Sequence, residues 1–146
     1  MERMKKRLIV MVLLMLAMAG CVGKPMTTLP NNPIEFRQVE VFNPRDNQDG
    51  YMAVIYNDRC YVPYGTLKGR IGKKDIDQCV GYIYDNSGDT NFHVCTLIAD
   101  PNNDFIVLVY EGGVMDQPMF LRAEDTYGQL INIPGYIDDL GYDYWR

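Results

Sequence analysis

The chain has 146 residues, a formal net charge of −5 and 47% hydrophobic residues. This length suits one domain of ordinary size, and the apolar content is high enough to form a core, which excludes a disordered chain. The acidic balance argues against nucleic-acid binding and against a polybasic attachment to anionic lipid, because both need clustered Lys and Arg. The single histidine argues against a histidine-rich metal site.

The first segment, residues 1–20, has the layout of a secretory signal peptide. Residues 1–7 carry four positive charges and one negative charge, and residues 8–18 form an unbroken apolar run. This run is shorter than the roughly 20 apolar residues that a transmembrane helix needs. Removal of residues 1–20 would leave a chain with a net charge of −8.

The end of this segment, Met18-Ala19-Gly20-Cys21, resembles the lipobox of bacterial lipoproteins. The resemblance covers residues 1–21 only, and it implies cleavage just before Cys21 and a diacylglycerol group on the Cys21 sulfur. Met18 stands where most lipoboxes have Leu. Since two acyl chains anchor a protein stably, we expect a lipid-anchored protein on the extracytoplasmic face of the cell membrane. An ordinary secretory signal that precedes a cysteine is the alternative.

Residues 21–33 are predicted to be the lipidated cysteine followed by an extended tether. Pro25, Pro30 and Pro33 favour an extended, solvated chain without internal hydrogen bonds. Residues 22–33, at about 3.1 Å each, would hold the folded part a few tens of Å from the lipid. Disorder between anchor and fold is a compatible interpretation.

Residues 34–146 are predicted to form a single β-rich domain. Segments rich in Val, Ile and Tyr alternate with turn residues, and residues 51–64 indicate a hairpin around Asn57-Asp58. The fold is predicted to be mainly β, with α+β as the alternative: a small antiparallel sheet, curled as a partial barrel or stacked as a sandwich. The strands are expected at 35–42, 51–56, 59–64, 80–85, 92–99, 105–110 and 114–123. The spacing of Ile137, Leu140 and Tyr144 predicts a short C-terminal helix within 138–145.

Three cysteines remain besides Cys21, namely Cys60, Cys79 and Cys95. An extracytoplasmic location permits disulfides. A Cys60–Cys79 bridge, which would close the polar loop between them, is the first expectation, and a fully reduced chain or a pairing with Cys95 stays open. Cys95 lies in an apolar segment and is expected to be a buried core residue.

Residues with catalytic or metal-binding chemistry are few. His93 and Cys95 are residue types that can form a base and nucleophile pair. However, residues two apart on a strand lie about 7 Å from each other, whereas proton transfer needs about 3 Å. No CxxC spacing supports a zinc site. The acidic run that starts at Asp46 fails the calcium-loop pattern, because its twelfth position is Asn57 rather than Glu. We therefore predict no catalytic residue, no metal and no cofactor.

Two groups of residues are candidates for binding. Lys68, Arg70, Lys73 and Lys74 form a basic patch that could contact an anionic wall polymer or the membrane surface, with a solvated loop as the alternative. The 11 tyrosines offer contact area for a protein or glycan partner, although cross-strand packing accounts for them equally. The aromatic residues near the C-terminus are expected to fold back over one end of the sheet.

Taken together, these features predict a non-enzymatic lipoprotein that presents a small β domain for binding or for an envelope-associated interaction. Its expected partners are the lipid membrane, through the anchor, and an unknown protein or glycan, with no nucleic acid. Two alternatives remain. One is a small hydrolase or redox enzyme that uses Cys95 and His93. The other is an inhibitor or immunity-type protein that blocks an external enzyme with the loop at residues 65–74.

Overall fold

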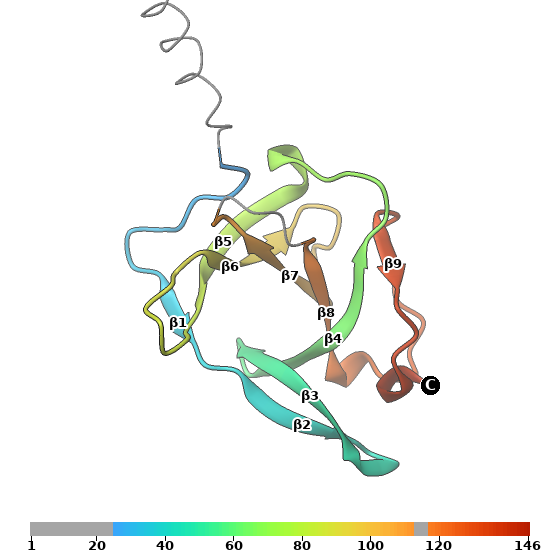
Figure 1. Cartoon of the computed structure of the whole chain (residues 1–146). Coiled ribbons are helices and arrows are strands. Elements are labelled where there is room, and N and C mark those ends of the chain that lie inside the picture. Colours follow the sequence, from blue (N-terminus) through green and yellow to red (C-terminus); the bar gives the residue numbers. More distant parts are fainter. Residues whose placement is uncertain (1–24, 113–116) are drawn as a thin grey trace, which may run out of the picture.

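The computed structural model describes residues 25–112 and 117–146 (Figure 1). The predicted signal peptide, Cys21 and the start of the predicted strand 114–123 lie outside the described residues. The described chain is β-rich. Its strands are β1 (Ile34–Phe36), β2 (Val39–Asn43), β3 (Asp46–Tyr56), β4 (Arg59–Leu67), β5 (Ile76–Ile83), β6 (Phe92–Leu97), β7 (Phe105–Tyr110), β8 (Met119–Ala123) and β9 (Ile137–Asp139).

The strands form one sheet in the order β1-β5-β6-β7-β8-β4-β3-β2, with β9 paired to β4. The sheet is mixed rather than wholly antiparallel, because β1 pairs with β5 in parallel, with Ile34 opposite Gly81. A parallel pair needs a long connection, and here the chain forms β2, β3 and β4 between the two partners. Gly81 permits this pairing, since a side chain there would collide with the backbone of Ile34.

The sheet curls into a half-barrel (Figure 1). Its two end strands, β1 and β2, are separated in the sequence only by Arg37 and Gln38, so the two edges of the sheet have to come near each other. Phe36 of β1 packs edge-to-face on Tyr56 of β3, with ring centroids 6.0 Å apart. Of the two predicted arrangements, the partial barrel is the one that forms.

The central strands β6, β7 and β8 bury both of their faces. Successive residues of a strand point to opposite sides of a sheet, and here each side carries an apolar cluster. One cluster includes Val94, Ile106 and Leu121, and the other includes Leu97, Val107 and Phe120. Burial on both faces explains why these strands have nearly continuous apolar sequences rather than a polar alternation.

The predicted helix within 138–145 does not form. This segment contains the end of β9 and a three-residue 3-10 helix, η3 (Asp143–Trp145). The apolar spacing instead reflects aromatic packing, because Tyr144 is 1% exposed and the Trp145 indole N–H donates to the carbonyl oxygen of Pro63 at 2.8 Å. The aromatic residues therefore fold back onto the sheet as predicted. In the described part of the chain, no helix has the length and apolar character to cross a bilayer.

The disulfide joins Cys79 of β5 to Cys95 of β6, and the Cys60 thiol is free. The expected Cys60–Cys79 bridge is therefore wrong. Cys79 and Cys95 lie directly opposite each other on neighbouring strands. Cys60 lies on β4, which is separated from β5 by β6, β7 and β8 in the sheet order. The disulfide also removes Cys95 as a nucleophile, so the predicted alternative of a Cys95–His93 catalytic pair is not formed.

Candidate functional site

Thr27, which lies inside the segment predicted to be a tether, is bonded to side chains of the folded domain. The Thr27 side chain is 4% exposed. Its hydroxyl donates to Glu111 Oε1 at 2.6 Å, its backbone N–H donates to the same oxygen at 2.8 Å, and its Oγ1 lies 2.8 Å from His93 Nδ1. We call these three residues the Thr27 latch. The latch fixes one residue of the predicted tether to the domain.

The latch is a structural contact rather than a catalytic one. Because the Thr27 hydroxyl donates its proton to Glu111, its oxygen is left to accept the Nδ1–H of His93. Burial lowers the pKa of His93, which keeps the ring neutral. A nucleophile–base–carboxylate chain would need the histidine between the other two groups, and here the hydroxyl occupies that place.

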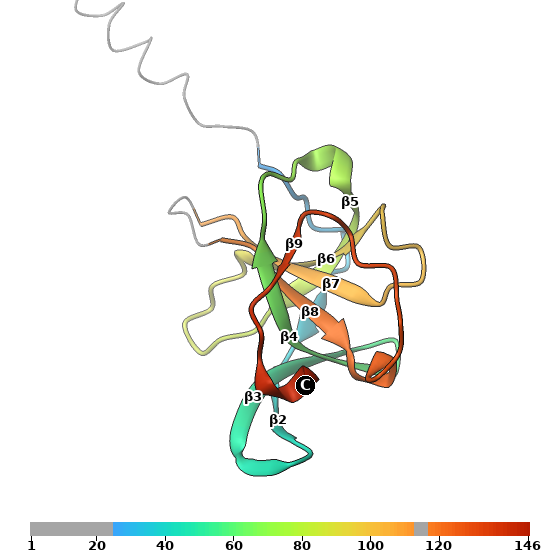
Figure 2. The same cartoon turned by 90° about the vertical axis from the view of Figure 1, so that its right-hand side faces the viewer.

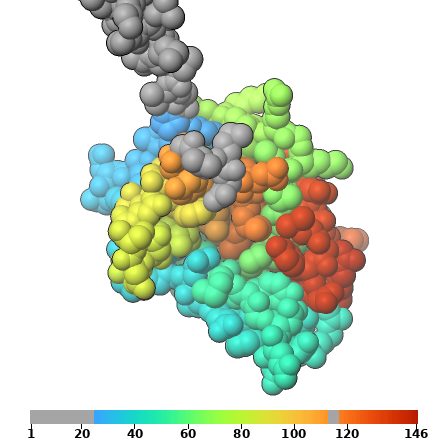
Figure 3. Space-filling model, in the orientation of Figure 1, coloured from blue at the N-terminus to red at the C-terminus, as the bar shows by residue number. Residues whose placement is uncertain are grey.

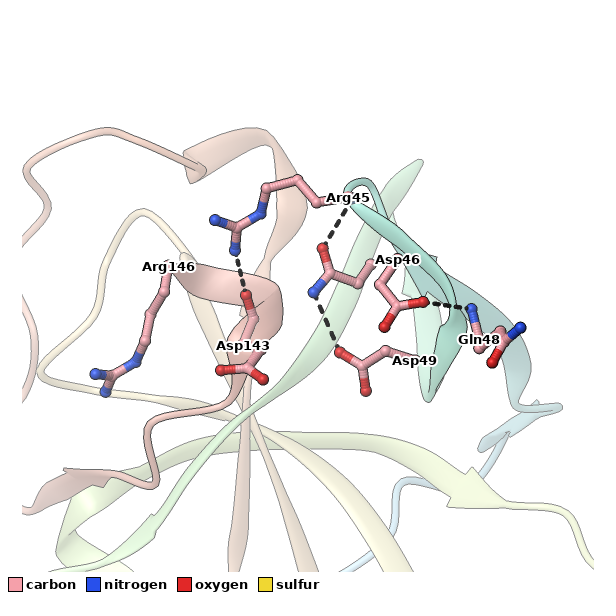
Figure 4. Close-up of a pocket in the computed structure, with 7 residues that line it drawn as sticks. Arg45, Asp46, Gln48, Asp49, Asp143 and Arg146 are labelled. Carbon is pink, nitrogen blue, oxygen red and sulfur yellow. Dashed lines mark hydrogen bonds between the residues drawn. The ribbon is translucent and has the colours of Figure 1, made fainter.

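A cleft of about 620 Å³ lies between the β2–β3 hairpin and the C-terminal segment (Figure 4). Every side chain that lines it is polar or charged. Asp49 of the hairpin and Asp143 of the C-terminal segment face each other across it (Figure 4). The full lining is Asn43, Arg45, Asp46, Gln48, Asp49, Asp143 and Arg146.

Hydrogen bonds hold the cleft in shape. Asn43, which is 5% exposed, donates its side-chain N–H to Asp49 Oδ2 at 3.1 Å and accepts the backbone N–H of Arg45 at 3.0 Å. The Tyr51 hydroxyl donates to the same Asp49 oxygen at 2.7 Å, and burial with this bond raises the pKa of Tyr51 to about 12. Arg45 joins the two walls by donating to the carbonyl oxygen of Asp143 at 2.6 Å.

These bonds leave acceptor groups directed at the cleft. Both bonds to Asp49 use Oδ2, so that its Oδ1 has no hydrogen-bond partner among residues 25–112 and 117–146. The Asp143 carboxylate likewise makes no ion pair or side-chain hydrogen bond in this part of the chain. A preorganised set of oxygen acceptors can bind cations and polar N–H or O–H groups at little cost in ordering.

A second cavity, of about 530 Å³, lies beside Arg59. Here the polar groups are already hydrogen-bonded to one another. The Arg59 guanidinium makes five hydrogen bonds of 2.7–3.0 Å, to the carboxylates of Asp104 and Asp125 and to the carbonyl oxygens of Asn102 and Asn103. The bonds from Arg59 hold the pKa of Asp125 below its usual value. The Arg59 cluster therefore stabilises the turn between β6 and β7.

The predicted basic patch, Lys68, Arg70, Lys73 and Lys74, lies in the loop between β4 and β5, where all four side chains are exposed. It does not contribute to the cleft. Cys60 is half-buried, and burial together with Glu124 raises the pKa of its thiol, so that the unreactive protonated form is favoured. Tyr61, Tyr64 and Tyr144 are buried, which supports cross-strand packing as the role of these three tyrosines.

Sequence reasoning missed the cleft. Its walls come from residues 43–49 and 143–146, and no local motif connects segments so far apart. Within residues 25–112 and 117–146, no group of three or more His, Cys, Asp or Glu side chains is arranged to hold a metal ion.

No protein-family model matches the chain, and no curated protein or solved structure shows significant similarity to it.

Proposed function

We propose that the protein is a lipoprotein, anchored through Cys21 to the extracytoplasmic face of a bacterial cell membrane, whose β domain is a non-enzymatic binding module. The observation that carries the proposal is the placement of two features. The described chain starts at one end of the domain, whereas the tip of the β2–β3 hairpin and the C-terminal segment, which form the cleft, lie at the other end (Figures 1 and 2). An anchor at the first end would present the cleft away from the lipid.

The Thr27 latch supports an attachment that holds the domain close to the membrane. Thr27 follows Cys21 by six residues, and a chain of this length spans at most about 20 Å when fully extended. A free tether through residue 33 would reach about twice as far. An anchor on Cys21 therefore restricts the domain to a thin layer above the lipid headgroups.

The cleft favours a basic protein segment as the ligand. Three carboxylates line it against two guanidinium groups, and Arg45 is already bonded to the Asp143 carbonyl. The Arg146 guanidinium lies 3.9 Å from the carboxylate of Asp139, a residue that does not line the cleft. The formal charge of the lining residues is therefore −1, which attracts a partner that carries Lys or Arg, whereas a neutral glycan would gain only hydrogen bonds.

Anchoring is tested by intact mass and thiol counting on the full chain made in a bacterial host. We expect the mass of a chain that begins at Cys21 and carries diacylglycerol, with Cys60 as the single free thiol. Cys21→Ala should abolish the lipid mass and the membrane fractionation, whereas the matched control Cys60→Ala should preserve both. An unacylated wild-type chain that begins at another residue would contradict the proposal.

Ligand binding is tested by titrating the detergent-solubilised full chain with a short oligolysine peptide and, separately, with a neutral oligosaccharide. Loss of two charges by Asp49→Asn with Asp143→Asn should weaken peptide binding by about fivefold, because each exposed ion pair contributes about 0.5 kcal/mol. The matched control Asp77→Asn removes an exposed carboxylate on β5, outside the cleft, and should leave affinity unchanged. Equal affinity of all three proteins would exclude the cleft as the binding site.

A further inference from the structure

We infer that the basic loop at residues 68–74 binds anionic lipid headgroups and thereby orients the domain with its cleft away from the membrane. The inference rests on the proposed lipid anchor, and it adds a second, electrostatic contact to it. A domain that is attached to the membrane at one lipidated residue can rotate about that residue. A second contact with the membrane restricts this rotation.

The loop lies at the end of the domain where the chain enters. Lys73 lines the same small cavity, of about 190 Å³, as Met26, Thr27 and Thr28. In two views at right angles, the loop that precedes β5 and the start of the described chain lie at the same end (Figures 1 and 2). The space-filling view shows both segments on the molecular surface at that end (Figure 3).

The four cations of the loop have no partners within the described part of the chain. Lys68, Arg70, Lys73 and Lys74 are exposed and make neither an ion pair nor a side-chain hydrogen bond there. The other basic residues of this part each bond to a protein oxygen or pair with a carboxylate. These are Arg37, Arg45, Arg59, Arg122 and Arg146. The positive charge of the loop is thus available to an external anion.

The backbone of the loop is held in place against the sheet. Ile71 and Leu67 pack against the larger apolar cluster, which fastens the loop to the sheet. Asp75 accepts the backbone N–H of Gly72 at 2.7 Å. Gly69 has a φ of +84°, which an L-residue with a side chain rarely adopts, and it turns the chain between Lys68 and Arg70.

Local charge and total charge act in opposite directions near an anionic surface. Residues 68–77 contain four cations against Asp75 and Asp77, whereas the chain as a whole is acidic. Because the field of a membrane falls off within about 8–10 Å at physiological salt, it acts mainly on the end of the domain that lies nearest. The basic loop at that end is attracted, which turns the cleft at the other end outward.

The test uses the full-length lipidated protein reconstituted into two sets of liposomes, one with roughly one third phosphatidylglycerol and one of phosphatidylcholine alone. An amine-reactive reagent is followed at Lys68, Lys73 and Lys74 by peptide mapping, since these are the lysines of the described chain. We expect labelling to be at least about threefold slower on the anionic liposomes, with recovery at about 0.5 M salt.

A charge variant tests the cause of this protection. In Arg70→Gln with Lys73→Gln and Lys74→Gln, the remaining Lys68 should label equally fast on both liposomes. The matched control Arg37→Gln removes an exposed cation outside the loop and should retain the protection. Protection that survives high salt, or that survives in the charge variant, would overturn the inference.

The liposome experiment distinguishes failure of the lipid anchor from failure of the contact between the basic loop and anionic lipid. Failure of the protein to float with either set of liposomes would contradict the lipid anchor. Flotation with both sets and equal labelling on both would overturn the inference and leave the anchor intact. Protection by a soluble polyglycerol phosphate, without protection on anionic liposomes, would also overturn it and assign the loop to a wall polymer.

Discussion

Replacing both cysteines of the Cys79–Cys95 disulfide by alanine will lower the free energy of unfolding by about 3 kcal/mol, as expected for a bridge that closes a loop of this size. The two cysteines are separated by 16 positions in the sequence. The bridge restricts the unfolded chain, and it connects β5 to β6 within the curled sheet. Alanine is preferred to serine because Cys95 is 0% exposed, and a hydroxyl there would be buried.

The measurement is urea denaturation of the oxidised wild type, the double variant and the matched control Cys60→Ala. The control removes the half-buried free thiol and leaves the bridge intact, so a loss of less than about 1 kcal/mol is expected. Dithiothreitol should lower the stability of the wild type and of Cys60→Ala, and it should not change that of the double variant. A double variant as stable as the wild type would mean that the bridge does not constrain the unfolded chain.

The second large effect is expected at Arg59, where Arg59→Ala should cost about 3 kcal/mol. Its side chain and that of Asp104 are 24% and 14% exposed, so both charges are largely removed from water. Truncation removes the Arg59 donor from the Asp104 carboxylate and from the carbonyl oxygen of Asn102, whereas the carbonyl oxygen of Asn103 keeps the Tyr61 hydroxyl as a donor. Arg59→Lys should recover only part of the loss, because an ammonium group cannot make the paired bonds that the guanidinium makes to Asp125.

The matched control is Arg37→Ala. Arg37 also pairs with a carboxylate, that of Glu35 at 3.2 Å, but the two side chains are 69% and 42% exposed. Exposed pairs contribute little, so we expect a change of less than about 0.5 kcal/mol. A loss for Arg59→Ala as small as that for Arg37→Ala in urea denaturation would show that the Arg59 network does not stabilise the fold.

The hairpin at 51–64 and the strand at 105–110 were predictable because their signals are local. Asn57 and Asp58 adopt φ values of 48° and 60°, the left-handed conformation that a tight hairpin turn requires and that Asn and Asp tolerate. The apolar run at 105–110 is β7, which lies between β6 and β8 with both faces covered. In both cases, neighbouring residues determine the element.

The predicted disulfide, the wholly antiparallel sheet and the C-terminal helix were wrong for a common reason. Each depends on which distant segments meet. The cysteine pairing follows from the strand order, the parallel pair β1–β5 follows from the curl, and the helical spacing near Tyr144 arises from packing against the sheet. A sequence pattern reports the periodicity of burial, but it does not report the partner that causes it.

The total charge of the chain does not describe the local charge of the basic loop. The sequence argued against a polybasic contact with lipid because the chain is acidic overall. The structure places the uncompensated cations of the described chain together beside the chain entry, while the other basic side chains are paired. Electrostatic interactions at short range depend on this local arrangement rather than on the sum.

The sequence by itself determined the β-rich class, the main turns and the expectation of an anchored, extracytoplasmic protein, because those properties depend on residues close together in the chain. Only the tertiary structure decided the curl of the sheet, the Cys79–Cys95 bridge, the Thr27 latch and the polar cleft. Each of these brings together residues from segments separated in the chain. Such contacts arise from the burial of apolar surface by the whole chain, which no short segment encodes.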